Sequence, residues 1–259
     1  MTFHPDWLRP AWQTEGVQAV MTTRHGGVSE GPYASMNLRD GVGDDPRCVA
    51  RNQSGLAELV GATPVYLNQV HGRCVVRLTT ADVAPDAALH DADACITTDI
   101  GVACTVQVAD CMPALFAAPG AVGAAHAGWR GLAGGVLEAT LDALCVAVRC
   151  QPDQVEVWLG PCIGPGRFEV GVDVLRAFGF DPAVPVQTGD PQQTPRFKPL
   201  KSGKWLANLP DLARDRLTAA GVASISGGTW CTASDASRFF SFRRDGVTGR
   251  MVAAIWRTR

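Results

Sequence analysis

The sequence lacks the short signatures by which many enzymes are found. It has no Gly-rich dinucleotide fingerprint, no phosphate-binding P-loop and no HExxH zinc motif, which removes the commonest motif-based assignments. The stretch Gly164-Pro165-Gly166 has no third glycine or following helix, so it predicts a turn. Nine cysteines form no CxxC pair and are odd in number, which argues against a disulfide framework.

The net charge is also small, and long apolar runs are absent. A formal net charge of -2 and a pI near 6.2 give no long-range electrostatic reason to expect nucleic acid or an anionic membrane as partner. No apolar run approaches the ~18 residues that span a bilayer, and the first residues show no basic segment followed by an apolar one. We therefore expect a cytoplasmic protein with mostly free, buried thiols and no obligate protein partner.

Apolar, β-branched runs predict that much of the core is sheet. The expected strands are Val17–Thr23, Val65–Val70, Cys74–Thr79, Cys95–Thr98, Val102–Val108, Ala114–Ala118 and Val155–Leu159. Apolar residues recur at three- and four-residue steps over Leu132–Val148, which predicts one long amphipathic helix. A second helix is expected from about Leu209 to Ala220, with Asn208 as N-cap and Gly221 as its stop.

The end of the chain predicts a β-hairpin of Phe239–Arg243 and Met251–Trp256. The Pro- and Gln-rich stretch from Asp181 to Pro195 predicts a surface loop. Because strands cluster and mix irregularly with helices, we expect a compact α+β fold with mixed β-sheets flanked by helices.

Three stretches place polar side chains where an apolar strand ends, at residues 68–72, 109–113 and 125–130. Strand ends can direct side chains into a shared cleft. The candidates are His71, Cys111 and His126, because imidazole and thiolate are preferred zinc ligands, and three protein ligands with an open fourth position make a catalytic site. Their spacing matches no local zinc-finger pattern, so each also has an ordinary packing interpretation.

Five longer segments stand out together, namely Gln69-Val70-His71-Gly72, Ala109-Asp110-Cys111-Met112-Pro113, His126-Ala127-Gly128-Trp129-Arg130-Gly131, Gly160-Pro161-Cys162-Ile163-Gly164-Pro165 and Phe239-Phe240-Ser241-Phe242-Arg243-Arg244-Asp245. In this combination they resemble the YfiH, or laccase-domain, family of purine nucleoside phosphorylases. The segments Thr23–Ser29 and Met36–Leu38 match in the same order, and the similarity runs from about residue 17 to residue 257.

The resemblance implies a single domain over residues 1–259, related to the catalytic fold of cytotoxic necrotizing factor toxins. It implies a zinc ion held by His71, Cys111 and His126, with purine nucleosides and phosphate as substrates. Family members are described as phosphorolysing adenosine, inosine and methylthioadenosine, and as deaminating adenosine. Such a zinc would supply activated water for deamination and would orient phosphate or the leaving base in phosphorolysis.

Both reactions need an acid that protonates the departing nitrogen. Asp110, beside Cys111, is the candidate for proton transfer or for orienting the site, and its position also suits a turn aspartate. The candidates for phosphate or ribose contacts are Arg24, Arg130, Arg243 and Arg250, followed by Asn37 and Glu169. Arg130 is favoured because it lies beside His126 at an expected helix start.

Other functions stay open. With Cys111 as nucleophile and His126 as base, the protein would be a metal-free hydrolase or amidase, in keeping with the peptidoglycan editing linked to some family members. A binding protein without turnover is a further alternative. Copper is a disfavoured cofactor, because five histidines are too few for a multicopper oxidase. A cytidine-type zinc deaminase does not fit, because Pro161-Cys162 continues as Ile163-Gly164 without a second cysteine.

Overall fold

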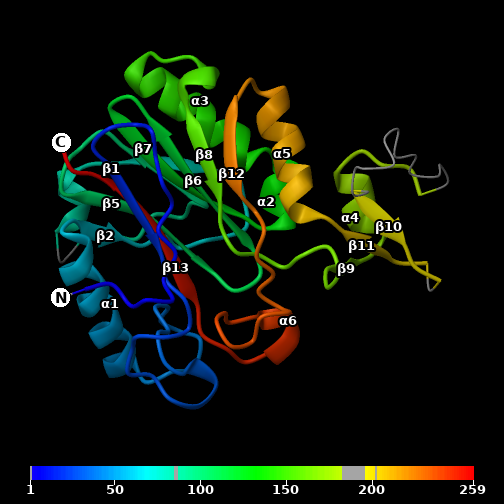
Figure 1. The fold of residues 1–259 in the computed structure, drawn as a ribbon, viewed down its shortest axis with the longest axis horizontal. Helices are drawn as coiled ribbons and strands as arrows, with labels where there is room; N and C mark the ends of the chain where they lie inside the picture. The colour runs from blue at the N-terminus through cyan, green and yellow to red at the C-terminus, as the bar shows by residue number, and fades with distance from the viewer. Residues whose placement is uncertain (1, 85–86, 183–195, 202) are drawn as a thin grey trace.

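A computed structural model describes residues 2–84, 87–182, 196–201 and 203–259, and two β-sheets form its centre (Figure 1). The larger sheet has the strand order β12-β8-β6-β7-β4-β3, and the second has the order β1-β13-β5-β2. The strands of the larger sheet are β3 (Val75–Leu78), β4 (Ala94–Thr97), β6 (Met112–Ala118), β7 (Ala121–Ala127), β8 (Glu156–Leu159) and β12 (Ser224–Gly227). Those of the second sheet are β1 (Val17–Met21), β2 (Thr63–Val65), β5 (Val102–Val108) and β13 (Met251–Arg257).

A third, small sheet has the order β10-β11-β9 and stands to one side of the other two (Figure 1). Its strands are β9 (Glu169–Val170), β10 (Phe197–Pro199) and β11 (Trp205–Ala207). The helices are α1 (Pro46–Val60), α2 (Trp129–Gly134), α3 (Val136–Val148), α4 (Val172–Ala177), α5 (Leu209–Ala219) and α6 (Phe242–Asp245). Short 3-10 turns occupy Gly31–Tyr33, Thr80–Val83 and Pro152–Gln154.

The apolar core is divided into three layers of contact. The central layer joins the facing sides of the two large sheets, with Met21 from one and Leu115 from the other. A second layer packs α1, through Leu56, on the outer face of the sheet that contains β13. A third packs α3 and α5 on the outer face of the larger sheet, around residues such as Leu144 and Phe116. The order of layers is therefore helix, sheet, sheet, helix.

This layering explains the near-continuous apolar runs in the middle of the chain. Every residue of β5, β6 and β7 is buried, because both faces of these strands are covered. Strand β7 is built mainly of alanine and glycine, which lets α3 approach closely: a Cβ placed on Gly123 would lie 3.4 Å from Leu144 Cδ1. The strand that carries His126 is thus held between two packed layers.

The expected α+β fold with mixed sheets is confirmed. β2 pairs with β5, β3 with β4 and β12 with β8 in parallel, whereas the other pairs of the two large sheets are antiparallel. Helix α5 starts after Asn208, whose side chain accepts from Asp211 N, and the chain turns at Gly221 with φ of 94°. Among the described helices, none combines the length and apolarity needed to cross a bilayer.

Three local predictions are wrong. The expected hairpin does not form: Phe242–Asp245 is the short helix α6, and β13 pairs with β1 and β5, because it closes the centre of a sheet. The helix over Leu132–Val148 is two helices, broken at Gly135, whose φ of 93° ends α2. The strand expected over Val65–Val70 ends at Val65, and the chain then turns towards the candidate site.

The remaining strand predictions agree with the structure to within two residues at each end. Residues 183–195 of the loop expected over Asp181–Pro195 lie outside the described part of the chain.

Candidate functional site

The three predicted metal ligands meet at one point. Cys111 directly precedes β6, His126 lies within β7, and His71 lies in the connection between β2 and β3. Their ligand atoms are all within 4.8 Å of one another. The two imidazole rings stand edge to face, with centroids 4.8 Å apart and an interplanar angle of 82°. His126 is buried, Cys111 is half-buried and His71 is exposed, so the cluster is open to solvent on one side.

Left-handed backbone places two residues of this centre. His71 has φ of 63° and Asp110 has φ of 89°, a conformation that costs a non-glycine residue about 1–3 kcal/mol. At His71 the turn is held by hydrogen bonds, because the carboxylate of Asp93 accepts from the backbone N–H groups of Val70, His71 and Gly72. Unusual backbone supported in this way is typical of functional sites.

Asp93 is the residue that joins the centre together. Its side chain is fully buried directly before β4. Besides the three backbone bonds, its Oδ1 lies 2.8 Å from Nδ1 of His126. An imidazole that donates from Nδ1 to a carboxylate keeps Nε2 free as a ligand or base. Asp93 therefore fixes both the tautomer of His126 and the turn that carries His71.

Opposite charges stabilise the thiolate and the imidazolium in this buried setting. Burial alone would raise the pKa of the Cys111 thiol, but contact with His126 and His71 lowers this pKa to about 6. Burial would likewise lower the pKa of His126, yet the Cys111 sulfur and the Asp93 carboxylate raise it to about 9. In the absence of a metal, Cys111 is therefore a thiolate and His126 an imidazolium at neutral pH.

The arrangement fits a zinc ion. Two imidazoles and one thiolate are zinc donors, and the hydrogen bond from His126 to Asp93 is the outer contact that metal-bound histidines usually make. Within the described residues the other histidines do not join the cluster. His4 stacks on His25 with ring centroids 5.9 Å apart, and His90 pairs with Asp82.

Two adjacent hollows flank the cluster. The first, of about 300 Å³, has an apolar lining that includes Trp129, Ile163, Phe168 and Leu209. The second, of about 320 Å³, has a polar lining of Arg39, Gln69, Gln107 and Arg250. His71, Ala109, Cys111 and Phe242 line both. The sulfur and one imidazole therefore lie between the first hollow, named the apolar hollow for its aromatic and aliphatic side chains although Arg130 and Arg243 also line it, and the second, named the cationic hollow for Arg39 and Arg250. Each is large enough for part of a small ligand.

The predicted substrate-binding arginines divide between the two hollows. Arg130 and Arg243 line the apolar hollow, where Arg130 lies 4.3 Å from the centre of the Trp129 ring. Arg243 also donates to the backbone oxygen of Glu169, whose own side chain pairs with Lys204. Arg250 lines the cationic hollow.

Two other predicted contacts lie outside the linings of both hollows. Arg24 donates to the backbone oxygens of Ala34 and Ala236. Asn37 is fully buried, and its amide bonds to the backbone of Arg39 and Arg250. Asn37 therefore supports the wall formed by Arg39 and Arg250 from behind, whereas the contacts of Arg24 lie away from both hollows.

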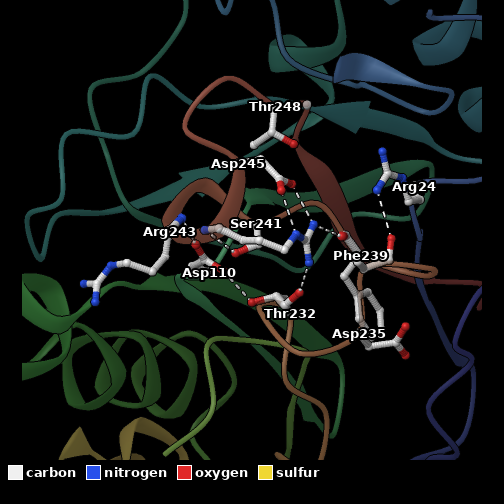
Figure 2. A network of polar contacts seen from close by, with 12 residues as sticks. Arg24, Asp110, Thr232, Asp235, Phe239, Ser241, Arg243, Asp245 and Thr248 are labelled. Atoms are coloured by element: carbon white, nitrogen blue, oxygen red, sulfur yellow. Dashed lines mark hydrogen bonds and ion pairs between the residues drawn. The ribbon is translucent and has the colours of Figure 1, made fainter. Parts of the chain in front are cut away.

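Asp110 connects Cys111 to the chain segment that forms one wall. Figure 2 shows its carboxylate between Thr232 and the backbone of Arg243, with Thr232 Oγ1 at 2.6 Å and Arg243 N at 2.6 Å. Arg244 completes this network by donating to the backbone oxygens of Thr232 and Phe239. Because both oxygens of Asp110 accept hydrogen bonds, its contacts suit a positioning role better than proton transfer.

Sequence reasoning missed Asp93, Arg39 and Phe242. A signal existed for Asp93, since a carboxylate next to an apolar strand must find donors when it is buried, although Asp91 two residues earlier carries the same signal. Arg39 follows the motif Met36–Leu38, but nothing local showed that it meets residues near the C-terminus. Phe242 is 57% exposed and lines both hollows, which only the three-dimensional structure reveals.

Comparisons with known proteins decide the family. The family model of the multi-copper polyphenol oxidoreductase laccase matches residues 18–258. This chain belongs to that laccase-domain family. It is 45% identical over 253 residues to a protein of Pseudomonas aeruginosa named purine nucleoside phosphorylase, covering 96% of this chain and 98% of that one. It is 43% identical over 260 residues to the purine nucleoside phosphorylase YfiH of Escherichia coli, covering 97% of each.

Solved structures of the laccase-domain family show the same fold. A crystal structure of a Neisseria meningitidis protein superposes with a TM-score of 0.86 at 43% identity, covering 98% of this chain and all of that one. YlmD from Geobacillus stearothermophilus also gives a TM-score of 0.86, at 35% identity, covering 98% and 96% of the two chains. The resemblance found in the sequence is confirmed over the full length.

The family name mentions several coppers, whereas the described residues bring together one cluster of three nitrogen and sulfur donors. A multicopper oxidase needs further imidazoles for a trinuclear centre. The donor set of this chain therefore fits one metal ion better than it fits multicopper chemistry.

Proposed function

We propose that this protein is a zinc-dependent purine nucleoside phosphorylase. One observation carries the proposal: the donor atoms of His71, Cys111 and His126 converge where an apolar hollow meets a cationic one. Such a layout suits a substrate with a flat base, a central sugar and an anionic co-substrate. The names of the bacterial relatives support the same reaction.

In phosphorolysis a phosphate oxygen forms a bond to C1′ of the ribose, and the bond from C1′ to N9 of the purine breaks. The aromatic lining of the first hollow, with Trp129 and Phe242, suits the base because offset stacking on rings contributes about 0.5–1.5 kcal/mol beyond burial. Arg130 and Arg243 lie at the same hollow and can donate hydrogen bonds to base or ribose.

A bound zinc, held by His71, Cys111 and His126, would act as a Lewis acid towards an oxygen or nitrogen of the substrate. The hydrogen bond from Nδ1 of His126 to Asp93 leaves Nε2 facing the cluster, and Nε2 would give up its proton when a metal binds. Asp110 keeps α6, with Phe242 and Arg243, beside Cys111.

Base release tests the proposal. Purified protein with inosine and phosphate is expected to form hypoxanthine and ribose 1-phosphate in equal amounts, and to form neither without phosphate. Adenosine and methylthioadenosine are expected to react in the same way. Ammonia release from adenosine without phosphate tests the deaminase activity separately. A rate of hypoxanthine formation that is the same with and without phosphate would contradict phosphorolysis.

Asp93→Asn is expected to weaken zinc binding by about 10- to 100-fold, the usual effect of removing a carboxylate that orients a metal-bound histidine. The neutral amide is a weaker acceptor for the Nδ1 proton than the carboxylate is, so it orients the ring less firmly and makes Nε2 a poorer donor to the metal. Competition with a chromogenic chelator measures the affinity. Asp91→Asn, two residues earlier on an exposed position, is the matched control and is expected to bind zinc normally. Equal zinc affinities in the two variants would show that Asp93 does not contribute to metal binding.

A second candidate function follows from one further observation. Asp93, His126 and Cys111 form a continuous chain of contacts in the order acid, base and thiol, as in metal-free thiol hydrolases. In this function the Cys111 thiolate would attack an amide carbonyl, the C–N bond would break as His126 protonates the leaving amine, and water would then hydrolyse the thioester. Some peptidoglycan-derived peptides would be substrates.

Metal removal separates the two candidates. A phosphorylase that depends on zinc is expected to lose activity in chelator and to regain it with added zinc. A thiol hydrolase is expected to keep amidase activity after metal removal and to lose it after alkylation of Cys111 by iodoacetamide. Cleavage of amides by metal-free protein would therefore favour the second candidate.

A further inference from the structure

The cationic hollow beside Cys111 contains two arginines from distant parts of the sequence. Arg39 lies in the segment between β1 and α1, and Arg250 directly precedes β13. The buried side-chain amide of Asn37 binds the backbone of both residues. Its Oδ1 accepts from Arg250 N at 2.9 Å and from Arg39 N at 3.2 Å. Nδ2 of Asn37 in turn donates to the backbone oxygen of Arg39. These hydrogen bonds fix the backbones of Arg39 and Arg250 next to each other.

Neither guanidinium has an anionic partner. In the described part of the chain, Arg39 and Arg250 form no ion pair, whereas Arg47, Arg196, Arg216 and Arg244 each pair with a carboxylate. Arg250 donates only to the backbone oxygens of Thr248 and Gly249. Burial, followed by the charge of Arg39, lowers the pKa of Arg250. The charges of Cys111 and Asp110 act in the opposite direction, each more weakly than that of Arg39, and an anion that enters the hollow would relieve the repulsion between the two arginines.

We infer that Arg39 and Arg250 form the subsite for free inorganic phosphate. The inference rests on the proposed phosphorylase function and adds the residues that bind the co-substrate. Guanidinium groups bind phosphate through paired, charge-assisted hydrogen bonds, and two of them offset most of its charge. Cys111 and His126 line the same hollow, so a phosphate held there lies next to the metal-binding centre. The base then occupies the apolar hollow on the other side of Cys111.

Phosphate binding to the zinc-loaded, full-length protein tests the subsite. Isothermal titration with inorganic phosphate alone is expected to show binding that weakens by about 10- to 100-fold in Arg39→Met and in Arg250→Met. Arg51→Met, an exposed change on α1 away from both hollows, is the control and is expected to leave phosphate affinity unchanged. Circular dichroism and zinc content verify that each variant is folded and loaded.

Kinetics add a readout that general damage to the site would not give. In both variants the KM for phosphate is expected to rise by about tenfold or more, while the KM for inosine changes by less than about threefold. Phosphate affinity equal to that of the unchanged protein in both variants would overturn the subsite. Binding of a purine 5′-monophosphate without binding of free phosphate would also overturn it.

The subsite and the proposed function fail in different ways. If the protein binds phosphate through Arg39 and Arg250 but releases no base from any nucleoside, the subsite stands and the phosphorylase assignment falls. If base release depends on phosphate but neither variant alters the KM for phosphate, the function stands and the subsite falls.

Discussion

Cys111→Ala is expected to lower phosphorolysis of inosine by about 10³-fold or more and to abolish tight zinc binding. The Cys111 sulfur contacts both imidazoles, so its removal takes away the one anionic donor of the cluster. Lewis-acid stabilisation contributes several kcal/mol, and each 1.36 kcal/mol changes a rate tenfold. Metal analysis of the purified variant, together with its kcat/KM for inosine, measures both effects.

Cys48→Ala is the matched control for this change, because Cys48 is a free, half-buried thiol on α1 outside both hollows. It is expected to retain activity and zinc. A Cys111→Ala variant that keeps full turnover would show that the thiolate takes no part in catalysis. A variant that loses turnover but keeps one tightly bound zinc would place the metal elsewhere.

Gly128→Ala is expected to lower activity by about 10²-fold without replacing any ligand. A Cβ at this position would lie 2.9 Å from Cys111 Sγ, so the sulfur must shift relative to the imidazole of His71, whose Cδ2 would be in ordinary contact at 3.4 Å. A displacement of about 1 Å at a reacting centre costs roughly this factor. The backbone of Gly128, with φ of -62°, accepts alanine, so the protein is expected to fold.

Gly134→Ala, on the same helix, is the control because its added Cβ would meet no atom within 4 Å. It is expected to match the unchanged protein in activity, zinc content and melting temperature. Normal activity in Gly128→Ala would mean that the spacing of Cys111 and His71 does not matter to the reaction. Such a result would count against a shared metal held by these two residues.

The sequence supports the general fold better than its local details. Continuous apolar runs such as Val102–Val108 predicted buried strands correctly, because a strand covered on both faces has no reason to alternate. The incorrect prediction of a C-terminal hairpin shows that a local sequence pattern does not identify the partner of a strand. Residues 251–257 are apolar because β13 fills the centre of a sheet between β1 and β5, and strand pairing between distant segments has no short-range signature.

Helix α1 was missed although its boundaries carry clear signals. Asp45 accepts from Arg47 N at the start, Pro46 occupies the first turn, and Gly61 ends the helix with φ of 67°. Its apolar face is thin, with Val49, Leu56 and Val60 interrupted by Asn52, whose amide bonds to surrounding loops. A face that includes a buried polar residue escapes a search based on hydrophobic period alone.

The candidate site was partly accessible to sequence reasoning. His71, Cys111 and His126 were identified through the family resemblance, because their spacing has no local code for a metal. Asp93 and Arg39 were not found, because the residues that each contacts or lies beside are distant in the sequence and come together only in the folded protein. A buried carboxylate with four donors and an unpaired arginine are recognisable when the hydrogen bonds of the structure are known.

Stepwise addition of zinc to metal-free protein, with inosine and saturating phosphate, is the most direct measurement of whether these three side chains form the working centre. Hypoxanthine formation is expected to rise linearly and to reach a plateau at about one zinc per chain, with no response in His71→Ala or His126→Ala. Full turnover by the metal-free protein, or a plateau of equal height in those two variants, would contradict the account.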